Sequence, residues 1–434
     1  MSGLLVAGTT SDAGKSAVTA GLCRALARRG VRVAPFKAQN MSNNSMVCRG
    51  PDGTGVEIGR AQWVQALAAR TTPEAAMNPV LLKPASDHRS HVVLMGKPWG
   101  EVASSSWCAG RRALAEAACR AFDALAARYD VVVAGFVVNK FRGDSDLLAP
   151  GLRDLERVTG RRVYGTLPWH PDLWLDSEDA LDLQGRRAAG TGARRVAVVR
   201  LPRISNFTDV DALGLEPDLD VVFASDPRAL DDADLIVLPG TRATIADLAW
   251  LRARDLDRAL LVHVAAGKPL LGICGGFQML GRVIRDPYGI EGPGGQVTEV
   301  EGLGLLDVET AFSPHKVLRL PRGEGLGVPA SGYEIHHGRI TRGDTAEEFL
   351  GGARDGPVFG TMWHGSLEGD ALREAFLRET LGLAPSGSCF LAARERRLDL
   401  LGDLVERHLD VDALLNLARH GCPPTLPFLA PGAP

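Results

Sequence analysis

A cysteine at a forced turn from strand to helix constrains the fold of this chain more than any other feature. The segment Leu271-Gly-Ile-Cys-Gly-Gly-Phe-Gln278 places Cys274 after a short apolar run and before a helix-forming stretch. Glycines around the cysteine let the backbone turn sharply, and such a turn exposes the side chain at its tip. A buried strand that runs directly into a helix is typical of a parallel α/β sheet.

The same turn predicts a reactive thiol. The N-terminus of the following helix favours the thiolate over the thiol, and the N–H group of Gly275 is placed to stabilise an oxyanion. The other six cysteines lack such surroundings and are expected to be structural. They are scattered, with neither metal-ligand spacing nor a disulfide framework: Cys23, Cys48, Cys108, Cys119, Cys389 and Cys422.

A thiolate nucleophile needs a base, and three histidines are candidates for it. His364 stands at the end of Pro357-Val-Phe-Gly-Thr-Met-Trp-His-Gly365, a strand that runs into a turn and presents a side chain at the edge of a sheet. His336 and His337 are neighbours in a predicted strand, so only one of them can face the site. We favour His364.

A second glycine-marked turn lies near the N-terminus. Gly8-Thr-Thr-Ser-Asp-Ala-Gly-Lys-Ser16 follows a predicted strand and opens a helix, which aims its backbone N–H groups at a polyphosphate. Lys15 would neutralise phosphate charge and the Ser16 hydroxyl would bind Mg²⁺, so we expect ATP and Mg²⁺ as cofactors. Five residues rather than four separate the glycines, and this longer loop resembles that of the dethiobiotin synthetase group. The predicted nucleotide-binding residues of the loop are Thr10, Asp12, Gly14, Lys15 and Ser16.

Apolar strands alternate with helical segments along the chain, which predicts an α/β fold with two parallel-sheet domains. We expect strands at 3–8, 31–36, 80–82, 130–133, 195–199, 235–238 and 269–273, and helices at 15–29, 60–70 and 111–128. The polar run Lys37–Ser45 is expected to be a loop. Residues 185–193 are the best candidate for a linker, and a charged amphipathic helical segment at 394–417 precedes a Pro-rich tail that we expect to be disordered. The predicted division is a P-loop synthetase-like domain at 1–185, a second domain at 194–380 and a C-terminal segment at 381–434.

The composition excludes some partners. The 434 residues include 49 basic and 52 acidic side chains, interspersed along the chain, which predicts neither a nucleic-acid partner nor an anionic membrane surface. No apolar run is long enough to cross a bilayer, and the N-terminus shows no signal peptide, so we expect a cytoplasmic protein. The expected partners are small molecules, and the oligomeric state is left open.

The second half resembles the class I glutamine amidotransferase domain, of flavodoxin-like fold, and in particular its corrinoid branch. Gly272–Gln278 matches the nucleophile motif, and Leu238-Pro-Gly-Thr-Arg-Ala-Thr-Ile-Ala-Asp-Leu248 matches the segment that completes the oxyanion hole. The resemblance implies that Cys274 and His364 are catalytic, and position 366 is Ser where most class I domains have Glu. What orients His364 is left open. The implied oxyanion-hole and glutamine-binding residues are Gly240, Thr241, Gly275 and Gln278.

Longer blocks resemble the cobyric acid synthase family: 35–45, 57–62, 77–84, 139–144 and 203–209. The resemblance implies ATP- and glutamine-dependent amidation of the b, d, e and g carboxylates of adenosylcobyrinic a,c-diamide, a step of cobalamin biosynthesis, with Lys37 near the nucleotide and substrate. The alternatives are the sister activity, cobyrinic acid a,c-diamide synthase, an inactive synthase, and a P-loop protein that binds nucleotide as a switch.

One stretch of that family pattern is absent. In the family, the strand that corresponds to Tyr129–Val133 runs into an acidic Gly-rich motif, and two further βα units precede the strand that leads to Asn139. Here Val133 is followed at once by Ala134-Gly135-Phe136. Two such units would be on the order of 60 residues. We therefore predict an internal deletion that compromises the synthetase half or rewires its sheet, whereas the glutaminase half has no such gap.

Overall fold

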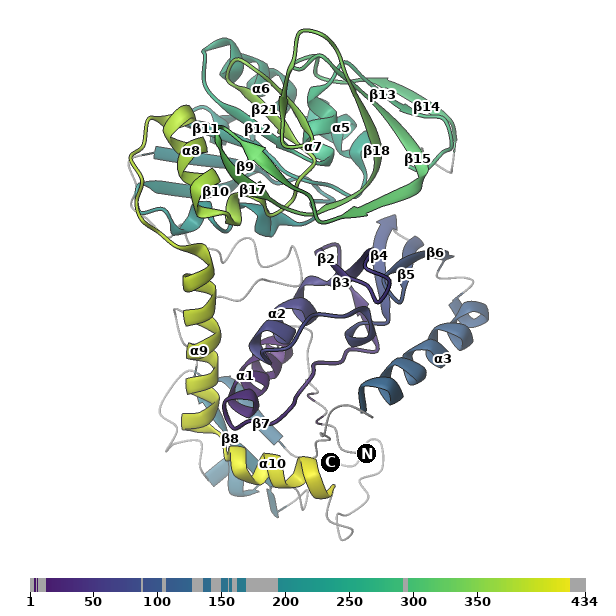
Figure 1. Ribbon diagram of the computed structural model, residues 1–434, viewed down its shortest axis with the longest axis vertical. Coiled ribbons are helices and arrows are strands. Elements are labelled where there is room, and N and C mark those ends of the chain that lie inside the picture. The colour runs from purple at the N-terminus through teal and green to yellow at the C-terminus, as the bar shows by residue number, and fades with distance from the viewer. Residues whose placement is uncertain are drawn as a thin grey trace.

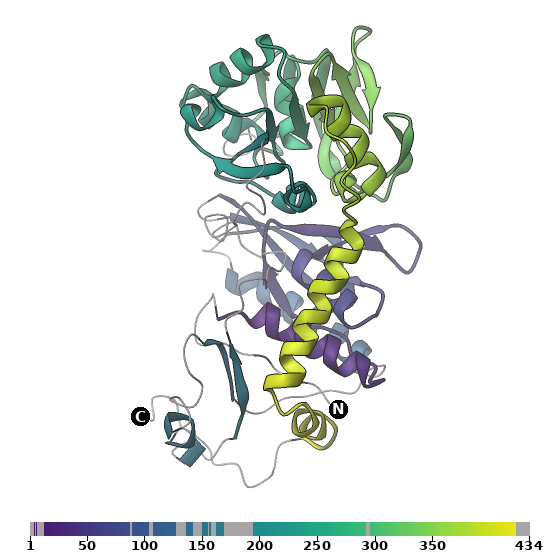
Figure 2. The same cartoon turned by 90° about the vertical axis from the view of Figure 1, so that its left-hand side faces the viewer.

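The computed structural model describes residues 4, 6, 13–86, 89–103, 107–126, 136–141, 150–154, 156–157, 162–168, 194–291 and 296–421. Figure 1 shows two bodies, one built from the second half of the chain (teal and green) and one from the first half (purple and blue). Figures 1 and 2 show a long C-terminal helix, drawn in yellow, that leaves the body of the second half and runs along the body of the first half. The expected strands at 3–8 and 130–133, the linker at 185–193 and the tail after 421 fall wholly or mostly outside the described residues.

The body formed by the second half is built on a seven-stranded sheet. Its strand order is β10-β9-β11-β12-β21-β20-β19, with β10 to β21 parallel and the last two strands antiparallel. The bounds are β9 Arg194–Val199, β10 Leu219–Ala224, β11 Leu235–Leu238, β12 Leu270–Ile273, β19 Glu347–Phe349, β20 Gly352–Asp355 and β21 Val358–Thr361. The expected strands at 195–199, 235–238 and 269–273 are confirmed.

Helices and a smaller sheet complete this body. The helices are α5 Thr244–Arg252, α6 Leu256–Ala265, α7 Gly275–Leu280 and α8 Asp370–Leu381. The smaller sheet has the order β14-β13-β15-β18, with β13 Val283–Asp286, β14 Thr298–Glu301, β15 Val308–Arg319 and β18 Glu334–Arg342. A hairpin joins β16 Arg322–Gly325 to β17 Val328–Ser331. Three of the parallel strands, β9, β11 and β12, are apolar and almost fully buried at their centres, which is the pattern of strands covered on both faces.

In the first half the sheets are mixed rather than wholly parallel. Strand β1 pairs in parallel with β4, whereas β4, β5 and β6 are antiparallel, and β7 pairs in parallel with β8 in a separate sheet. The helices at 15–29, 60–70 and 111–128 are confirmed as α1 Lys15–Arg28, α2 Arg60–Ala68 and α3 Trp107–Ala126. The strands are β1 Gln39–Met41, β2 Ser45–Arg49, β3 Gly55–Gly59, β4 Val80–Ser86, β5 Arg89–Leu94, β6 Lys97–Ala103, β7 Phe136–Phe141 and β8 Val163–Pro168.

Two expectations for this half are wrong. Residues 31–36 form no strand, and they pair with no strand among the described residues. The polar run Lys37–Ser45 is not a solvated loop, because it contains β1 and buries several side chains. Asn40 is only 1% exposed, and its amide donates to Gln62 Oε1 at 3.1 Å. Amide side chains tolerate burial when their hydrogen bonds are satisfied, and the sequence pattern does not reveal those partners.

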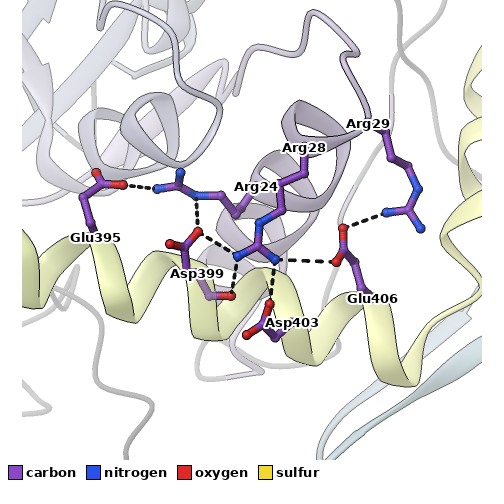
Figure 3. A network of polar contacts seen from close by, with 7 residues as sticks. All are labelled: Arg24, Arg28, Arg29, Glu395, Asp399, Asp403 and Glu406. Atoms are coloured by element: carbon purple, nitrogen blue, oxygen red, sulfur yellow. Dashed lines mark hydrogen bonds and ion pairs between the residues drawn. The ribbon is translucent and has the colours of Figure 1, made fainter.

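The C-terminal helices pack against the first half. The amphipathic segment predicted at 394–417 is confirmed as α9 Phe390–His408 and α10 Val411–His420. Leu401 and Val405 of α9 share one hydrophobic cluster with Leu22 and Leu26 of α1. Beside this cluster, arginines of α1 face carboxylates spaced along α9 (Figure 3), namely Arg24, Arg28 and Arg29 against Glu395, Asp399, Asp403 and Glu406. The end of the chain thus completes the core of its beginning.

Candidate active site

Cys274 occupies a strained turn between β12 and α7. Its φ of 50° and ψ of −108° are rare for a residue with a side chain, so the surrounding structure must hold it there. The turn requires the glycine that the motif supplies, because a Cβ atom at Gly276 would lie 2.0 Å from the carbonyl oxygen of Leu238. The cysteine is buried at the carboxyl edge of the parallel sheet, where ligands of such sheets bind.

His364 lies beside this cysteine. It follows β21, the strand next to β12, and its imidazole is hydrogen-bonded to the side chain of Cys274. Burial lowers the pKa of His364. The negative charges of Asp209 and Cys274, and hydrogen bonds to both, raise this pKa by more than burial lowers it, so that it reaches about 10. The imidazole of His364 is therefore expected to carry its proton at neutral pH. His336 and His337 instead donate to the carbonyl oxygens of Gly338 and Ser313.

Asp209 orients His364. The sequence analysis had left open which group orients this histidine. Its Oδ2 accepts from His364 Nδ1 at 2.7 Å, and its Oδ1 accepts from the backbone N–H of Gly365 at 2.8 Å. Asp209 lies in a short 3₁₀ helix, Phe207–Val210, after β9. The block 203–209 stood out in the sequence, but no local spacing ties its last residue to a histidine 155 positions away.

The predicted oxyanion-hole residues surround this pair. A Cβ atom at Gly275 would lie 3.1 Å from the backbone nitrogen of Thr241, and one at Gly240 would lie 3.0 Å from His364 Cε1. Both backbone segments therefore border the cysteine and the histidine. The Thr241 hydroxyl hydrogen-bonds to Asp247, so it is the backbone of Thr241 that faces the site. Gln278 is buried, and its Oε1 accepts from Thr244 Oγ1 at 3.2 Å.

Two charged residues near this site were not singled out by the sequence. Glu291 accepts a hydrogen bond from the backbone N–H of Thr244 at the start of α5. Burial raises the pKa of Glu291 to about 7, although the charge of Arg242 and hydrogen bonds from Thr244 and Ile245 oppose the rise. Arg242 directly follows Thr241, and its buried Nε has no hydrogen-bond partner among the described residues. Arg242 lies within the segment 238–248 that was matched to the oxyanion hole, but no role was assigned to it there, and Glu291 belongs to no motif.

A buried ion cluster joins the two bodies close by. Glu57 of β3 is fully buried and bonds to both Lys83 of β4 and Lys316 of β15. Burial raises the pKa of Glu57, but the two lysines lower it more, to well below its usual range. Burial also lowers the pKa of Lys83 to about 7, against the opposing effect of Glu57. Lys316 belongs to the second half of the chain, so this cluster crosses the boundary between the bodies.

The described part of the nucleotide loop fits a polyphosphate. Gly14 has a φ of 80° and precedes α1, which begins with Lys15 and Ser16 and has no acidic residue in its first turn. Such a helix start is favourable for phosphate. Thr10 and Asp12 lie outside the described residues. Lys37 lies in the first half, where its Nζ donates to Asn40 Oδ1 at 2.7 Å.

A cysteine–histidine pair at the carboxyl edge of a flavodoxin-like sheet agrees with the class of glutamine amidotransferases, and the family match of this half shows that class. Residues 195–372 match the CobB/CobQ-like glutamine amidotransferase domain, and residues 4–182 match the CobQ/CobB/MinD/ParA nucleotide binding domain. The chain belongs to the cobyric acid synthase family. It is 88% identical to the cobyric acid synthases of Mycobacterium tuberculosis and Mycobacterium bovis and 75% identical to that of Mycobacterium ulcerans, with all of each chain covered.

These alignments confirm that a stretch is absent. They span 494 positions, whereas this chain has 434 residues, so 60 positions of the relatives have no counterpart here. Because both ends are covered, the gap is internal. The 434 residues of this chain make up 88% of the 494 aligned positions, which equals the identity to the Mycobacterium tuberculosis protein. The gap therefore accounts for nearly all of the difference, and almost no aligned residue is substituted. The size agrees with the two βα units expected to be missing after Val133.

Similarity to solved structures is weaker. A crystal structure of a glutamine amidotransferase is 20% identical and covers 43% of this chain and 99% of its own, with a TM-score of 0.34. Among the residues that the structure describes, no helix combines the length and the apolar character needed to span a membrane.

Proposed function

We propose that this chain is built for the ATP- and glutamine-dependent amidation of the b, d, e and g carboxylates of adenosylcobyrinic a,c-diamide, in cobalamin biosynthesis. Full-length identity of 88% to proteins named cobyric acid synthase carries the proposal and favours it over the sister diamide synthase. Its substrates are small molecules, and we place the reaction in the cytoplasm. The division into 1–185, 194–380 and 381–434 remains part of the proposal.

In the glutaminase half, the Cys274 thiolate attacks the carboxamide carbon of glutamine. The oxyanion accepts hydrogen bonds from the N–H of Gly275 and from the backbone of the Gly240–Thr241 segment. The His364 imidazolium gives its proton to the leaving ammonia, and as a neutral base it then activates the water that hydrolyses the thioester. Asp209 keeps the imidazole in the tautomer and orientation that these transfers need.

The charged pair near the site would recognise the amino acid part of glutamine. Within the described part of the chain, the buried Nε of Arg242 donates no hydrogen bond, which suits a guanidinium that binds the α-carboxylate. The carboxyl group of Glu291 suits the α-ammonium, whose positive charge would replace the solvation that Glu291 has lost. Thr244 links the two sides of this region, because its backbone N–H donates to Glu291 and its hydroxyl donates to Gln278 of α7, the helix that follows Cys274.

In the synthetase half, Lys15 and Ser16 would hold the nucleotide phosphates and Mg²⁺, and Lys37 would lie near them. The phosphoryl group of ATP converts a carboxylate into an acyl phosphate, which ammonia can attack. The start of α1, without acidic residues and preceded by Gly14, supports this assignment.

A second candidate function is a glutaminase whose ligase reaction is lost. The 60 positions without a counterpart favour it, because they fall in the synthetase half by the sequence pattern. Parallel strands also need crossovers that the Val133–Gly135 junction is too short to supply.

One experiment separates the two candidates. The purified chain and a version with the missing segment restored are given ATP, glutamine and the diamide corrinoid, and both glutamate and corrinoid masses are measured. Glutamate from both proteins, with the hexa-amide only from the restored one, would favour the second candidate. Formation of the hexa-amide by this chain at the rate of the restored protein would reject it.

A further inference from the structure

The loop that carries His364 is held from outside its own body. Glu368 ends the short 3₁₀ helix Ser366–Glu368, which begins two residues after the histidine. Its Oε1 accepts from Arg60 Nη2 at 3.1 Å, and its Oε2 accepts from Arg394 Nη1 at 3.0 Å. Arg60 opens α2 in the first half, and Arg394 lies in the C-terminal helix α9. One carboxylate near the histidine therefore joins three distant parts of the chain.

The two arginines are themselves fixed in place. The Arg60 guanidinium lies 5.1 Å from the centre of the Trp63 ring, and that of Arg394 lies 5.0 Å from the same ring. Arg60 is 1% exposed and also contacts the sulfur of Met46. A buried guanidinium loses its water, so its paired carboxylate is strongly held in one position. The position of Glu368 is thus set by Arg60 of the first half and by Arg394 of α9.

The loop that carries Asp209 has a similar link. Asn206 precedes the 3₁₀ helix that contains Asp209, and it adopts a left-handed conformation with a φ of 50°. Its Oδ1 accepts from the backbone N–H of Ser45 at 3.0 Å, and both residues are buried. The carbonyl oxygen of Asn206 in turn accepts from the N–H of Asp209 at 3.0 Å. Ser45 begins β2, the strand in which Met46 follows it.

Tyr333 closes the arrangement on the side of the imidazole. Its ring stacks on that of His364 with a centroid distance of 5.2 Å, and the two residues exchange backbone hydrogen bonds of 3.0 and 2.9 Å. The same tyrosine packs in the hydrophobic cluster of the first half with Met46 and Ile58. Through Tyr333, the imidazole of the catalytic histidine is thus packed against the hydrophobic cluster of the first half.

We propose that Arg60 is a positioning residue of the glutaminase, acting through Glu368 on the loop of His364, with Ser45 acting through Asn206 on the loop of Asp209. By this arrangement glutamine hydrolysis depends on the body that would consume the ammonia. The inference rests on the proposed function and extends it, because it assigns a role in glutamine hydrolysis to residues of the synthetase half.

The test is the kinetics of glutamine hydrolysis by the full chain and its variants. Arg60→Met should lower kcat by about ten- to a hundredfold with little change in KM for glutamine, since misplacing a catalytic group by about 1 Å has effects of this size. Arg60→Lys should recover part of the loss. The double variant Arg60→Met/Asp209→Asn should have a kcat only slightly lower than that of Asp209→Asn alone, because both substitutions act on the same imidazole.

Controls separate positioning from loss of folding. Arg354→Met removes an arginine that pairs with Glu379 in the same body as the active site, and it should leave kcat within about twofold. Arg394→Met leaves Arg60 on Glu368 and should give an intermediate loss if Arg60→Met fails to fold. Wild-type kcat in Arg60→Met and Arg394→Met, or full additivity with Asp209→Asn, would overturn the inference. A wild-type chain that does not hydrolyse glutamine would overturn the proposed function itself.

Discussion

Oδ2 of Asp209 lies 2.7 Å from Nδ1 of His364, although 155 positions separate the two residues. The contact gives the histidine the partner that class I domains usually place two residues after it, where this chain has Ser366. The carboxylate comes from the loop after β9, a strand that β11 and β12 separate from β21, rather than from the loop after β21 itself. Cys274, His364 and Asp209 together have the arrangement of a nucleophile, a base and an orienting acid.

Asp209→Asn should reduce kcat for glutamine hydrolysis by up to about 10⁴-fold, the loss known when a triad aspartate becomes an asparagine. The amide cannot hold the imidazolium, so His364 should lose its proton at a lower pH than the value of about 10 that it has here. The alkaline limb of the pH profile of kcat should therefore move to lower pH in this variant. Asp218→Asn, an exposed site before β10, is the matched control and should leave the profile unchanged.

The same contact predicts how stability depends on pH. The folded pKa of His364 is raised above its ordinary value of 6.5, so the stabilisation is fully present below 6.5 and is lost as the pH rises through about 10. Urea unfolding at pH 6 and at pH 10 should show this loss in the wild-type chain and a smaller one in Asp209→Asn. Equal losses in the two proteins would mean that the ion pair contributes nothing to stability.

Arg242→Met should raise KM for glutamine by about ten- to a hundredfold, the worth of a hydrogen bond to a charged group. The reacting carboxamide is not touched, so kcat should change much less. Initial rates of glutamate release at varied glutamine concentration measure both constants. Arg258→Met is the control, because Arg258 is exposed on α6 and pairs only with Asp255 among the described residues. A fall in kcat at constant KM would contradict the assigned role.

Glu57→Gln should destabilise the chain by about 3–5 kcal/mol, because Lys83 and Lys316 would remain buried without their carboxylate. The pKa of Glu57 is depressed, so its stabilisation is present above the unfolded value and is lost as the pH falls toward the folded one. Urea unfolding at pH 7 measures the loss. Glu324→Gln, at an exposed position of β16, should shift the midpoint very little.

Gly21→Ala should separate α1 from α9 and cost about 1–3 kcal/mol. A Cβ atom at Gly21 would lie 2.6 Å from Val405 Cγ2 and 2.9 Å from the carbonyl oxygen of Leu401. Backbone atoms of a helix cannot move aside, so the ion pairs of Figure 3 should lengthen as well. Thermal unfolding measures the effect. Gly214→Ala adds the same methyl group in open space and should leave the midpoint unchanged.

Local patterns predicted the elements whose causes are local. The apolar runs at 235–238 and 269–273 became β11 and β12, and the helix after Gly14 became α1, because each pattern reflects burial of one continuous segment. The run Lys37–Ser45 was misjudged for the converse reason. Its amides are satisfied by distant residues such as Gln62, and such partners leave no mark on the run itself.

By itself the sequence predicted the strand-to-helix turn at Cys274, His364 as the favoured base at the end of a strand, and the absence of a stretch on the order of 60 residues. The first two features depend on short local segments, and the third follows from an interruption of the family's sequence pattern. Only the tertiary structure decided that Asp209 orients His364, that Arg60 and Arg394 share Glu368, and that α9 packs on α1. The physical reason is that most of these contacts join segments more than a hundred residues apart, and all of them depend on how the elements pack. Hydrophobic burial, and not sequence spacing, determines which side chains meet.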